Sequence, residues 1–154
     1  MRPEPVPTLD PRGDYLTRVW RDGVYPLAEE LGVTMKLPPV QPRSRVAHEA
    51  AKWAATVDRF DDYNEAVFRA FFERGENIGE AELLVKLAED LNLDGYELRR
   101  ALTLHQFEKQ VIADEREASA LGVHAVPAFV ANRRAALSGV QAVSALAALV
   151  DRAT

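Results

Sequence analysis

The sequence contains no cysteine among its 154 residues. Without a thiol the chain can form no disulfide bond, build no thiolate metal site and supply no cysteine nucleophile. Disulfides are typical of oxidising compartments, and the opening stretch MRPEPVPTLDPRGD lacks the apolar segment of a secretory signal. We therefore expect a cytoplasmic protein.

The sequence also lacks long apolar runs and an excess of positive charge. No run approaches the roughly 18 to 20 consecutive apolar residues that a membrane-spanning helix needs. Its 19 lysines and arginines are outnumbered by 24 aspartates and glutamates, which gives a net charge of −5. Because nucleic acids are polyanions, this balance disfavours them as ligands. The sequence therefore predicts neither a nucleic-acid-binding protein nor a membrane protein.

Motifs for metal binding and for hydrolysis are missing as well. The three histidines, His48, His105 and His124, stand far apart, without the short spacing that metal ligands show. Ser138 has no Gly-x-Ser-x-Gly context and no neighbouring histidine that would activate it as a nucleophile. We predict no metal site, no cofactor and no catalytic residue in this chain.

What the sequence does contain is mostly helical periodicity. Residues 1–14 are rich in proline and charge and predict an extended lead-in, whereas residues 15–121 carry apolar residues at helical spacing. Gly23 and Pro26 are expected to interrupt the first helical run. Capping residues predict further helix starts, and these residues are Asp10, Asp62 with Glu65, and Asp94 with Glu97. The last run, 105–121, predicts one long charged helix.

The pattern changes after Gly122. The segments PAFVA and AALSG flank Asn132-Arg133-Arg134, which predicts two short strands joined by a tight turn. A final helix is expected at 141–151, and its predicted buried residues are Val143, Leu146, Leu149 and Val150. The sequence thus predicts a mostly α fold with a small β-hairpin. A helical domain (15–121) and a C-terminal part (122–154) are expected to form one compact unit.

Several stretches of the chain resemble one known family, among them AVFRAFFERGENIGEAELLVKLAEDLNLD, which is similar to part of that family's helical insertion. LGVHAVPAFVANRRAALSGVQ is similar to the tail of the DsbA-like thioredoxin-fold family, particularly its FrnE-like branch, where Gly-Val-x-x-Val-Pro-x-Phe precedes a hairpin and Ser-Gly-x-Gln. Upstream, LPPVQPRSRVAHEAAKWA resembles the proline-containing loop and the following helix of that branch. The resemblance spans roughly residues 5–150 and implies a truncated thioredoxin-like α/β fold with a large helical insertion.

The resemblance also implies a site. In this family the proline is cis, and the residue before it pairs its backbone with an extended substrate near the reactive disulfide. Carried over to this sequence, Val126 and Pro127 form the substrate-side loop. Ala125 adjoins them, and His124 is either part of the lining or an exposed loop residue. The family's N-terminal strand, Cys-x-x-Cys helix and second strand have no counterpart here, so the resemblance covers the part without the thiol chemistry.

Three functions stay open on these observations. The first is a redox-inactive protein that binds an extended peptide or a partner chain at Val126–Pro127. The second is an enzyme completed by a missing N-terminal segment or a partner chain, either a protein disulfide oxidoreductase or a glutathione-dependent isomerase. The isomerases tend to read Gly-Gln-Asp-Arg where this chain has SGVQAVSA, which disfavours that branch. The third is a purely structural helical interaction module.

The missing strands also bear on assembly. In a thioredoxin-like sheet the first strand lies beside the hairpin, so its loss would leave the hairpin with an unpaired edge. An exposed strand edge, together with uncovered apolar sides of the 105–121 helix and the last helix, invites pairing with another chain. We therefore expect a homodimer joined through the hairpin edge or the flanking helices, or a complex with a partner chain.

Overall fold

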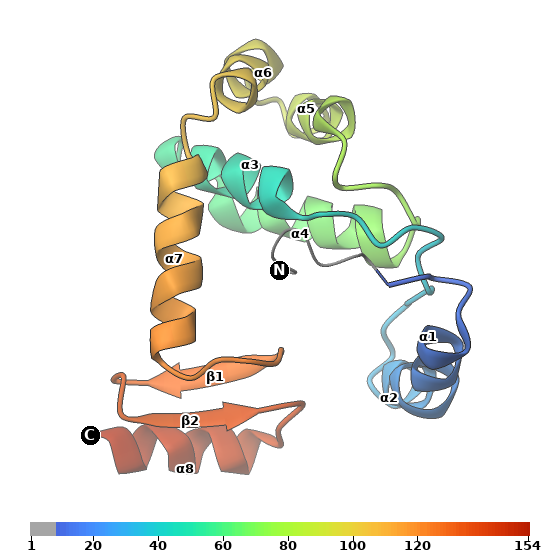
Figure 1. Ribbon diagram of the computed structural model, residues 1–154, viewed down its shortest axis with the longest axis vertical. Helices are drawn as coiled ribbons and strands as arrows, with labels where there is room; N and C mark the ends of the chain where they lie inside the picture. Colours follow the sequence, from blue (N-terminus) through green and yellow to red (C-terminus); the bar gives the residue numbers. More distant parts are fainter. Residues whose placement is uncertain (1–8) are drawn as a thin grey trace. The chain divides into compact units, whose positions relative to one another are not determined.

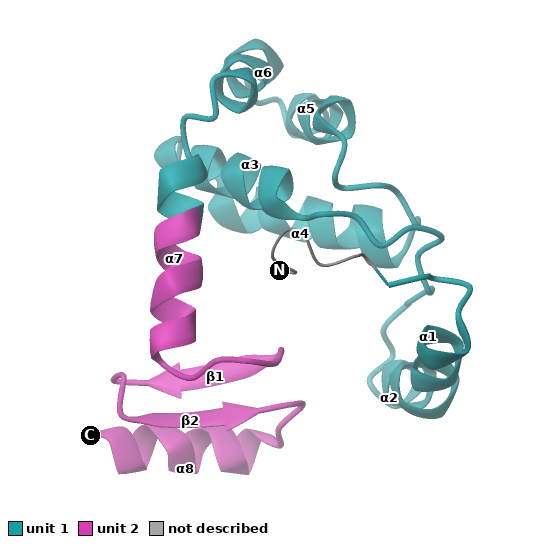
Figure 2. Ribbon diagram, in the orientation of Figure 1, with its two compact units in different colours: residues 1–111 teal, residues 112–154 magenta. Residues whose placement is uncertain are grey.

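The computed structural model describes residues 9–154 and contains two compact units, one extending to Val111 and the other running from Ile112 to Thr154 (Figure 2). Along the chain, the boundary between the units falls inside a helix, whereas the sequence suggested a boundary after residue 121. Most of the predicted extended lead-in, residues 1–8, lies outside the described residues. Within the described part of the chain, no helix is long and apolar enough to cross a bilayer.

The first unit begins with three short helical segments, α1 (Asp14–Val19), η1 (Trp20–Val24) and α2 (Tyr25–Glu30) (Figure 1). α1 starts after Gly13, so the prediction that Asp10 caps a helix is wrong. The Asp10 carboxylate instead accepts a hydrogen bond from the backbone N–H of Arg12 at 2.9 Å. Asp10 therefore stabilises a turn before the helix, a position that favours short polar side chains for the same reason as an N-cap does.

The segment η1 is a turn of π-helix. The backbone N–H of Tyr25 donates to the carbonyl of Trp20, five residues earlier. Pro26 follows directly and has no N–H to donate within the helix, and Gly23 adds backbone freedom. The predicted interruption is therefore confirmed, and it takes the form of a widened turn. That turn brings the rings of Trp20 and Tyr25 together edge to face, with centroids 5.5 Å apart.

The core of the first unit lies among α3 (Arg45–Thr56), α4 (Phe60–Phe72), α5 (Ala81–Asp90) and α6 (Gly95–Thr103). Each helix carries apolar residues at three- and four-residue spacing, so one face of each is buried against the others. The most deeply buried apolar side chains include Ala50, Ala54, Tyr63, Ala70, Leu84, Ala88 and Leu98. Inside this core the Tyr63 hydroxyl donates to the carbonyl of Leu84 at 2.9 Å.

The starts of α6 and α4 can be compared with the predicted capping residues. Asp94 accepts a hydrogen bond from the backbone N–H of Glu97 at 3.0 Å and caps α6, as predicted. The prediction for Asp62 with Glu65 is wrong, because α4 already begins at Phe60. Asp62 lies in the first turn, where a carboxylate is favoured by the helix dipole, and it pairs with Arg59 at 2.8 Å.

α7 (Glu108–Ala120) follows a turn at residues 104–107 and carries the chain from the first unit into the second. The helix predicted over 105–121 therefore starts three residues later than expected. The reason is His105, whose positive φ of 48° is incompatible with a continuing α-helix and ends α6. Val111 is the buried residue of α7.

The second unit contains an antiparallel hairpin and a helix. β1 (Ala128–Ala131) pairs with β2 (Ala135–Ser138), and α8 (Val143–Ala153) runs alongside both strands (Figure 1). Phe129 lies opposite Leu137, and both are half-buried. Val130 lies opposite Ala136, and both are exposed. Because side chains alternate between the two faces of a strand, α8 covers the Phe129 face and leaves the Val130 face open.

The predicted hairpin is confirmed by its turn. Asn132 and Arg133 have positive φ values of 47° and 59°, as the two central residues of a type I′ turn require. The backbone N–H of Arg134 donates to the carbonyl of Ala131 at 3.0 Å and closes the turn. The Asn132 amide donates to the carbonyl of Ala153 at 2.8 Å, which ties the turn to the end of α8.

The final helix buries a narrower stripe than predicted. Leu149 is buried and Leu146 is half-buried, as expected. The prediction is wrong for Val143 and Val150, which are mostly exposed. The hairpin is only two short strands wide, so it covers one line of side chains along α8 and not a broad face.

Candidate functional site

The loop before β1 contains the residues that the sequence predicted as a substrate-side site. His124, Ala125, Val126 and Pro127 are all exposed, and Val126 is 85% accessible to solvent. The Val126–Pro127 peptide bond is cis and the strand begins at the next residue, as predicted. The structure thus places these residues together at the end of the hairpin away from its turn.

The pairing of Gly139 with Pro127 shows which backbone groups of β1 are used inside the hairpin. The Gly139 N–H donates to the Pro127 carbonyl at 2.8 Å, one pair beyond the end of β1. In an antiparallel ladder, hydrogen-bonded pairs alternate with pairs whose backbone groups point outward. Phe129 therefore bonds to β2, whereas the N–H and C=O groups of Ala128 and Val130 point to the outer edge of β1.

This outer edge has no partner strand within residues 9–154, because the sheet consists of β1 and β2. Residues 125–131, with the sequence AVPAFVA, carry no charge. Edge strands are commonly protected by charged side chains, by proline or by a bulge. Pro127 stands only at the start of the strand, so the β1 edge, defined here as the outward backbone groups of Ala128 and Val130, is open to main-chain pairing.

Two exposed valines beyond β2 extend the site and were missed by the sequence reasoning. Because Gly139 pairs with Pro127, Val140 leaves the ladder at the same end of the hairpin as Val126. Val143 follows in the first turn of α8 and is 84% exposed. We call Val126, Val140 and Val143 the open end of the hairpin. In the sequence, the one indication of this part of the site was a valine directly after Gly139.

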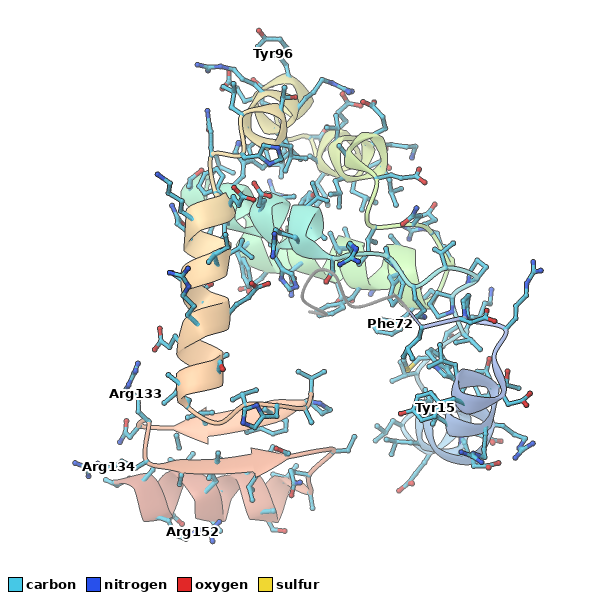
Figure 3. The ribbon with its side chains drawn as sticks, in the orientation of Figure 1. Tyr15, Phe72, Tyr96, Arg133, Arg134 and Arg152 are labelled. Atoms are coloured by element: carbon cyan, nitrogen blue, oxygen red, sulfur yellow. The ribbon has the colours of Figure 1, made fainter. Side chains whose placement is uncertain are left out.

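The turn end of the hairpin is charged. Arg133 and Arg134 project from the turn and Arg152 from α8 (Figure 3). Arg133 forms an ion pair with Glu117 of α7. The second unit therefore presents an apolar end and a charged end, and the cis bond belongs to the apolar one.

The histidines and the serine that were considered as metal ligands or as a nucleophile do not form a site. His48 lies in α3, His105 in the turn before α7, and His124 in the second unit. Within the described residues no group of three or more histidines and carboxylates is suited to hold a metal ion. Ser138 ends β2, and its carbonyl accepts a hydrogen bond from the Gln141 side chain at 2.7 Å. The site offers backbone groups and apolar side chains, which is chemistry for binding.

Comparison with known proteins agrees with this architecture. Residues 12–151 match the DSBA-like thioredoxin domain model. The chain is 35% identical over 136 residues to the uncharacterized protein YwbO of Bacillus subtilis, covering 84% of this chain and 67% of that protein. The crystal structure of a probable DsbA oxidoreductase from Streptomyces coelicolor matches 92% of this chain with a TM-score of 0.76 and 25% identity. This chain spans 62% of the length of the Streptomyces protein. The chain therefore belongs to the DSBA-like thioredoxin domain family.

Proposed function

We propose that this chain is a binding protein of the FrnE-like branch of its family, which holds an extended peptide or a partner chain at the β1 edge. The observation that carries the proposal is the open edge of β1 directly beside the exposed residues Val126 and Pro127. An extended chain laid along β1 would exchange hydrogen bonds with Ala128 and Val130, as in strand addition to other sheet edges.

The groups available at this site set the expected affinity. Ala128 and Val130 offer four outward backbone groups, and each hydrogen bond contributes about 0.5–1.5 kcal/mol net. Full burial of a valine of the open end would add about 1.5–3 kcal/mol. Because binding also immobilises the peptide, we expect dissociation constants on the order of micromolar to millimolar.

The proposal assigns no thiol–disulfide exchange to this chain by itself. The attacking group in that reaction is a thiolate, and the sequence has no cysteine. Insulin reduction by the purified chain is expected to equal the buffer background. Reduction clearly above that background would contradict this part of the proposal.

A fluorescence anisotropy titration tests the binding function. The probe is a labelled ten-residue peptide of alternating valine and threonine, which favours an extended backbone. Val126→Asp should weaken binding by about tenfold or more, because the carboxylate would have to be desolvated under the peptide. Val150→Asp is the matched control, since Val150 is also an exposed valine of this unit but lies outside the open end.

A second probe separates main-chain pairing from apolar contact. The same peptide, N-methylated at alternate residues, cannot donate along one edge and is expected to lose binding. Equal affinity of the methylated and unmethylated peptides would rule out strand addition. Equal affinity of wild type and Val126→Asp would remove the loop from the site.

A second candidate function is the substrate-binding part of a disulfide oxidoreductase whose thiols reside in another segment or another chain. The similarity to a probable DsbA oxidoreductase, of which this chain spans 62%, favours it. A separately expressed strand–Cys-x-x-Cys helix–strand segment should then restore insulin reduction when it is mixed with this chain. If the mixture stays at background while the peptide still binds, the first function holds and the second fails.

The β1 edge also fits a second copy of this chain, because two antiparallel β1 strands present the same groups to each other. We expect a homodimer in sedimentation at micromolar concentration. Val130→Pro removes an outward N–H without breaking the β1–β2 ladder and should shift the dimer to monomer. A monomeric wild type that binds no apolar dye would show that the edge is covered within the chain.

A further inference from the structure

The Ser-Gly-x-Gln motif begins with the last residue of β2 and forms a closed turn. The Gln141 side-chain amide donates a hydrogen bond to the Ser138 carbonyl at 2.7 Å. Gly139 lies between them with a positive φ of 81°, a conformation that favours glycine. Gln141 is half-buried, whereas its neighbours Val140 and Ala142 are exposed. The Gln141 side chain is therefore folded back onto the end of β2.

The Ser138 carbonyl points away from β1. Gly139 pairs with Pro127 across the hairpin, and in an antiparallel ladder such pairs alternate with pairs whose backbone groups point outward. The N–H and C=O groups of Ala136 and Ser138 therefore form the outer edge of β2, which we call the β2 edge. A donor prefers to lie near the plane of the carbonyl to which it bonds. The Gln141 amide thus takes the place that the N–H of an added strand would take.

The two edges of the hairpin differ mainly in this contact. Ala128 and Val130 on the β1 edge, like Ala136 and Ser138 on the β2 edge, are uncharged. In the described part of the chain, no side chain bonds to the outward groups of the β1 edge. On the β2 edge, an added strand would have to displace the Gln141 amide before it could donate to Ser138. Because one hydrogen bond contributes modestly in water, this competition should lower the affinity of the β2 edge about three- to tenfold.

We propose that Gln141 blocks the β2 edge and thereby directs an added strand to the β1 edge. This inference rests on the proposed function, because it concerns which edge that function uses. Selection of one edge favours one bound peptide per chain. It also favours a dimer in self-pairing, since chains that pair through both edges would form an open-ended array. The Ser-Gly-x-Gln motif thereby gains a role in binding that does not require it to touch the bound strand.

An anisotropy titration with the valine–threonine peptide tests this role in the full chain. Val130→Pro removes the outward N–H of the β1 edge, so the peptide is left with the blocked β2 edge and its affinity should fall about three- to tenfold. Adding Gln141→Ala to Val130→Pro opens the β2 edge and should restore the affinity to within about twofold of the wild type. A residue that served only the structure of the hairpin would not restore binding when it is removed.

Gln110→Ala, added to Val130→Pro, is the matched control. Gln110 is an exposed glutamine of α7 and lies outside the hairpin. The affinity of this double variant should stay at that of Val130→Pro. Recovery of binding in the control would overturn the inference, because the recovery would then not depend on the β2 edge.

A second measurement decides the question if Val130→Pro does not fold. In a peptide titration of Gln141→Ala followed by amide chemical shifts, Ala136 should reach half-saturation at about three- to tenfold less peptide than in the wild type. The shifts of Ala128 should have the same midpoint in both chains. Equal midpoints for Ala136 in the two chains would overturn the inference.

The outcomes separate this inference from the proposed function. If the wild type binds the peptide and removal of Gln141 restores nothing in Val130→Pro, the inference is overturned and the function stands. If the wild type does not bind and Gln141→Ala does, the function fails and the role of Gln141 stands. If neither binds, or if Val130→Pro binds as tightly as the wild type, both fail.

Discussion

The helices α3–α6 and the hairpin with α8 bury their apolar residues to different extents. In the helical core, Tyr63, Leu84 and Leu98 are fully enclosed, and the one buried tyrosine hydroxyl there has a hydrogen-bond partner. In the hairpin unit, Leu149 and Ala153 are the buried residues of α8, and the strands are at most half-buried. Apolar residues of that unit remain exposed at its open end.

The difference explains why the binding proposed above is placed on the hairpin unit. A helix bundle satisfies its backbone internally and offers a neighbour only side chains. A two-stranded sheet is marginal by itself and keeps unpaired backbone groups on its outer edges. The proposed binding of another chain is therefore assigned to the hairpin unit and not to the helical core.

The strongest test of this comparison is a pair of leucine truncations. Leu84→Ala removes a fully buried side chain and should lower the free energy of unfolding by about 2–5 kcal/mol. Leu146→Ala, at a half-buried position in α8, should cost about 1 kcal/mol or less. Urea denaturation followed by circular dichroism measures both. Equal losses would mean that the two units are packed alike.

Substitutions at the N-terminal ends of α6 and α8 should change the stability of the protein in opposite directions. Asp94→Ala removes the side-chain cap of α6 and should destabilise the protein by about 1 kcal/mol. α8 has no side-chain cap, and Ala142 at its N-cap position has the extended backbone (φ −66°, ψ 150°) that a capping residue adopts. Ala142→Asp should therefore stabilise α8 by about the same amount. A neutral result at Ala142 would show that the α8 end is held by other contacts.

The buried tyrosine gives a pH-dependent test of the helical core. Tyr63→Phe removes the hydrogen bond to Leu84 and should cost about 0.5–1.5 kcal/mol at neutral pH. Burial raises the pKa of the Tyr63 phenol far above its usual value. Folding therefore retains a proton that the unfolded chain releases near about pH 10, and wild-type stability should fall above that pH. The decrease should be smaller in Tyr63→Phe, as measured by denaturation at pH 9 and 11.

The smallest effect is expected for the charged end of the hairpin. Arg133 and Glu117 are both about half exposed or more, so their ion pair should contribute about 0.2–1 kcal/mol and less at high salt. Arg133→Ala is expected to leave thermal unfolding in 0.5 M salt unchanged. A large loss there would mean that α7 and the hairpin turn depend on this contact for their structure.

Features that depend on local backbone chemistry were predictable from the sequence. The hairpin turn followed from Asn132-Arg133-Arg134, the interruption of the first helical run from Gly23 and Pro26, and the α6 cap from Asp94 with Glu97. The predictions for Asp10 and Asp62 were wrong because the same short carboxylate also stabilises a turn or the first turn of a helix.

Features that depend on how much of a helix face is covered, or on how deeply a side chain is buried, were not predictable from the sequence. Periodicity identifies one face of α8 but not how much of it a two-stranded sheet can cover, so Val143 and Val150 were assigned to the core in error. Glu49 lies in a run of charged and apolar residues and gave no sign of its burial. Likewise, the loop 124–127 was identified by resemblance, whereas the contribution of Val140 became visible only through the Gly139–Pro127 pair.

The π-helical turn at Trp20–Val24 determines how this part of the chain tolerates deletions. In a regular α-helix, deleting one residue rotates everything before it by about 100° relative to everything after it. In η1 the backbone hydrogen bond from Tyr25 to Trp20 already spans one residue more than an α-helical bond. Deleting Gly23 would shorten that bond to the α-helical span and leave both flanks in register. Because Pro26 has no N–H to donate and its ring would meet the carbonyl four residues earlier, the segment is expected to accept this deletion only together with Pro26→Ala.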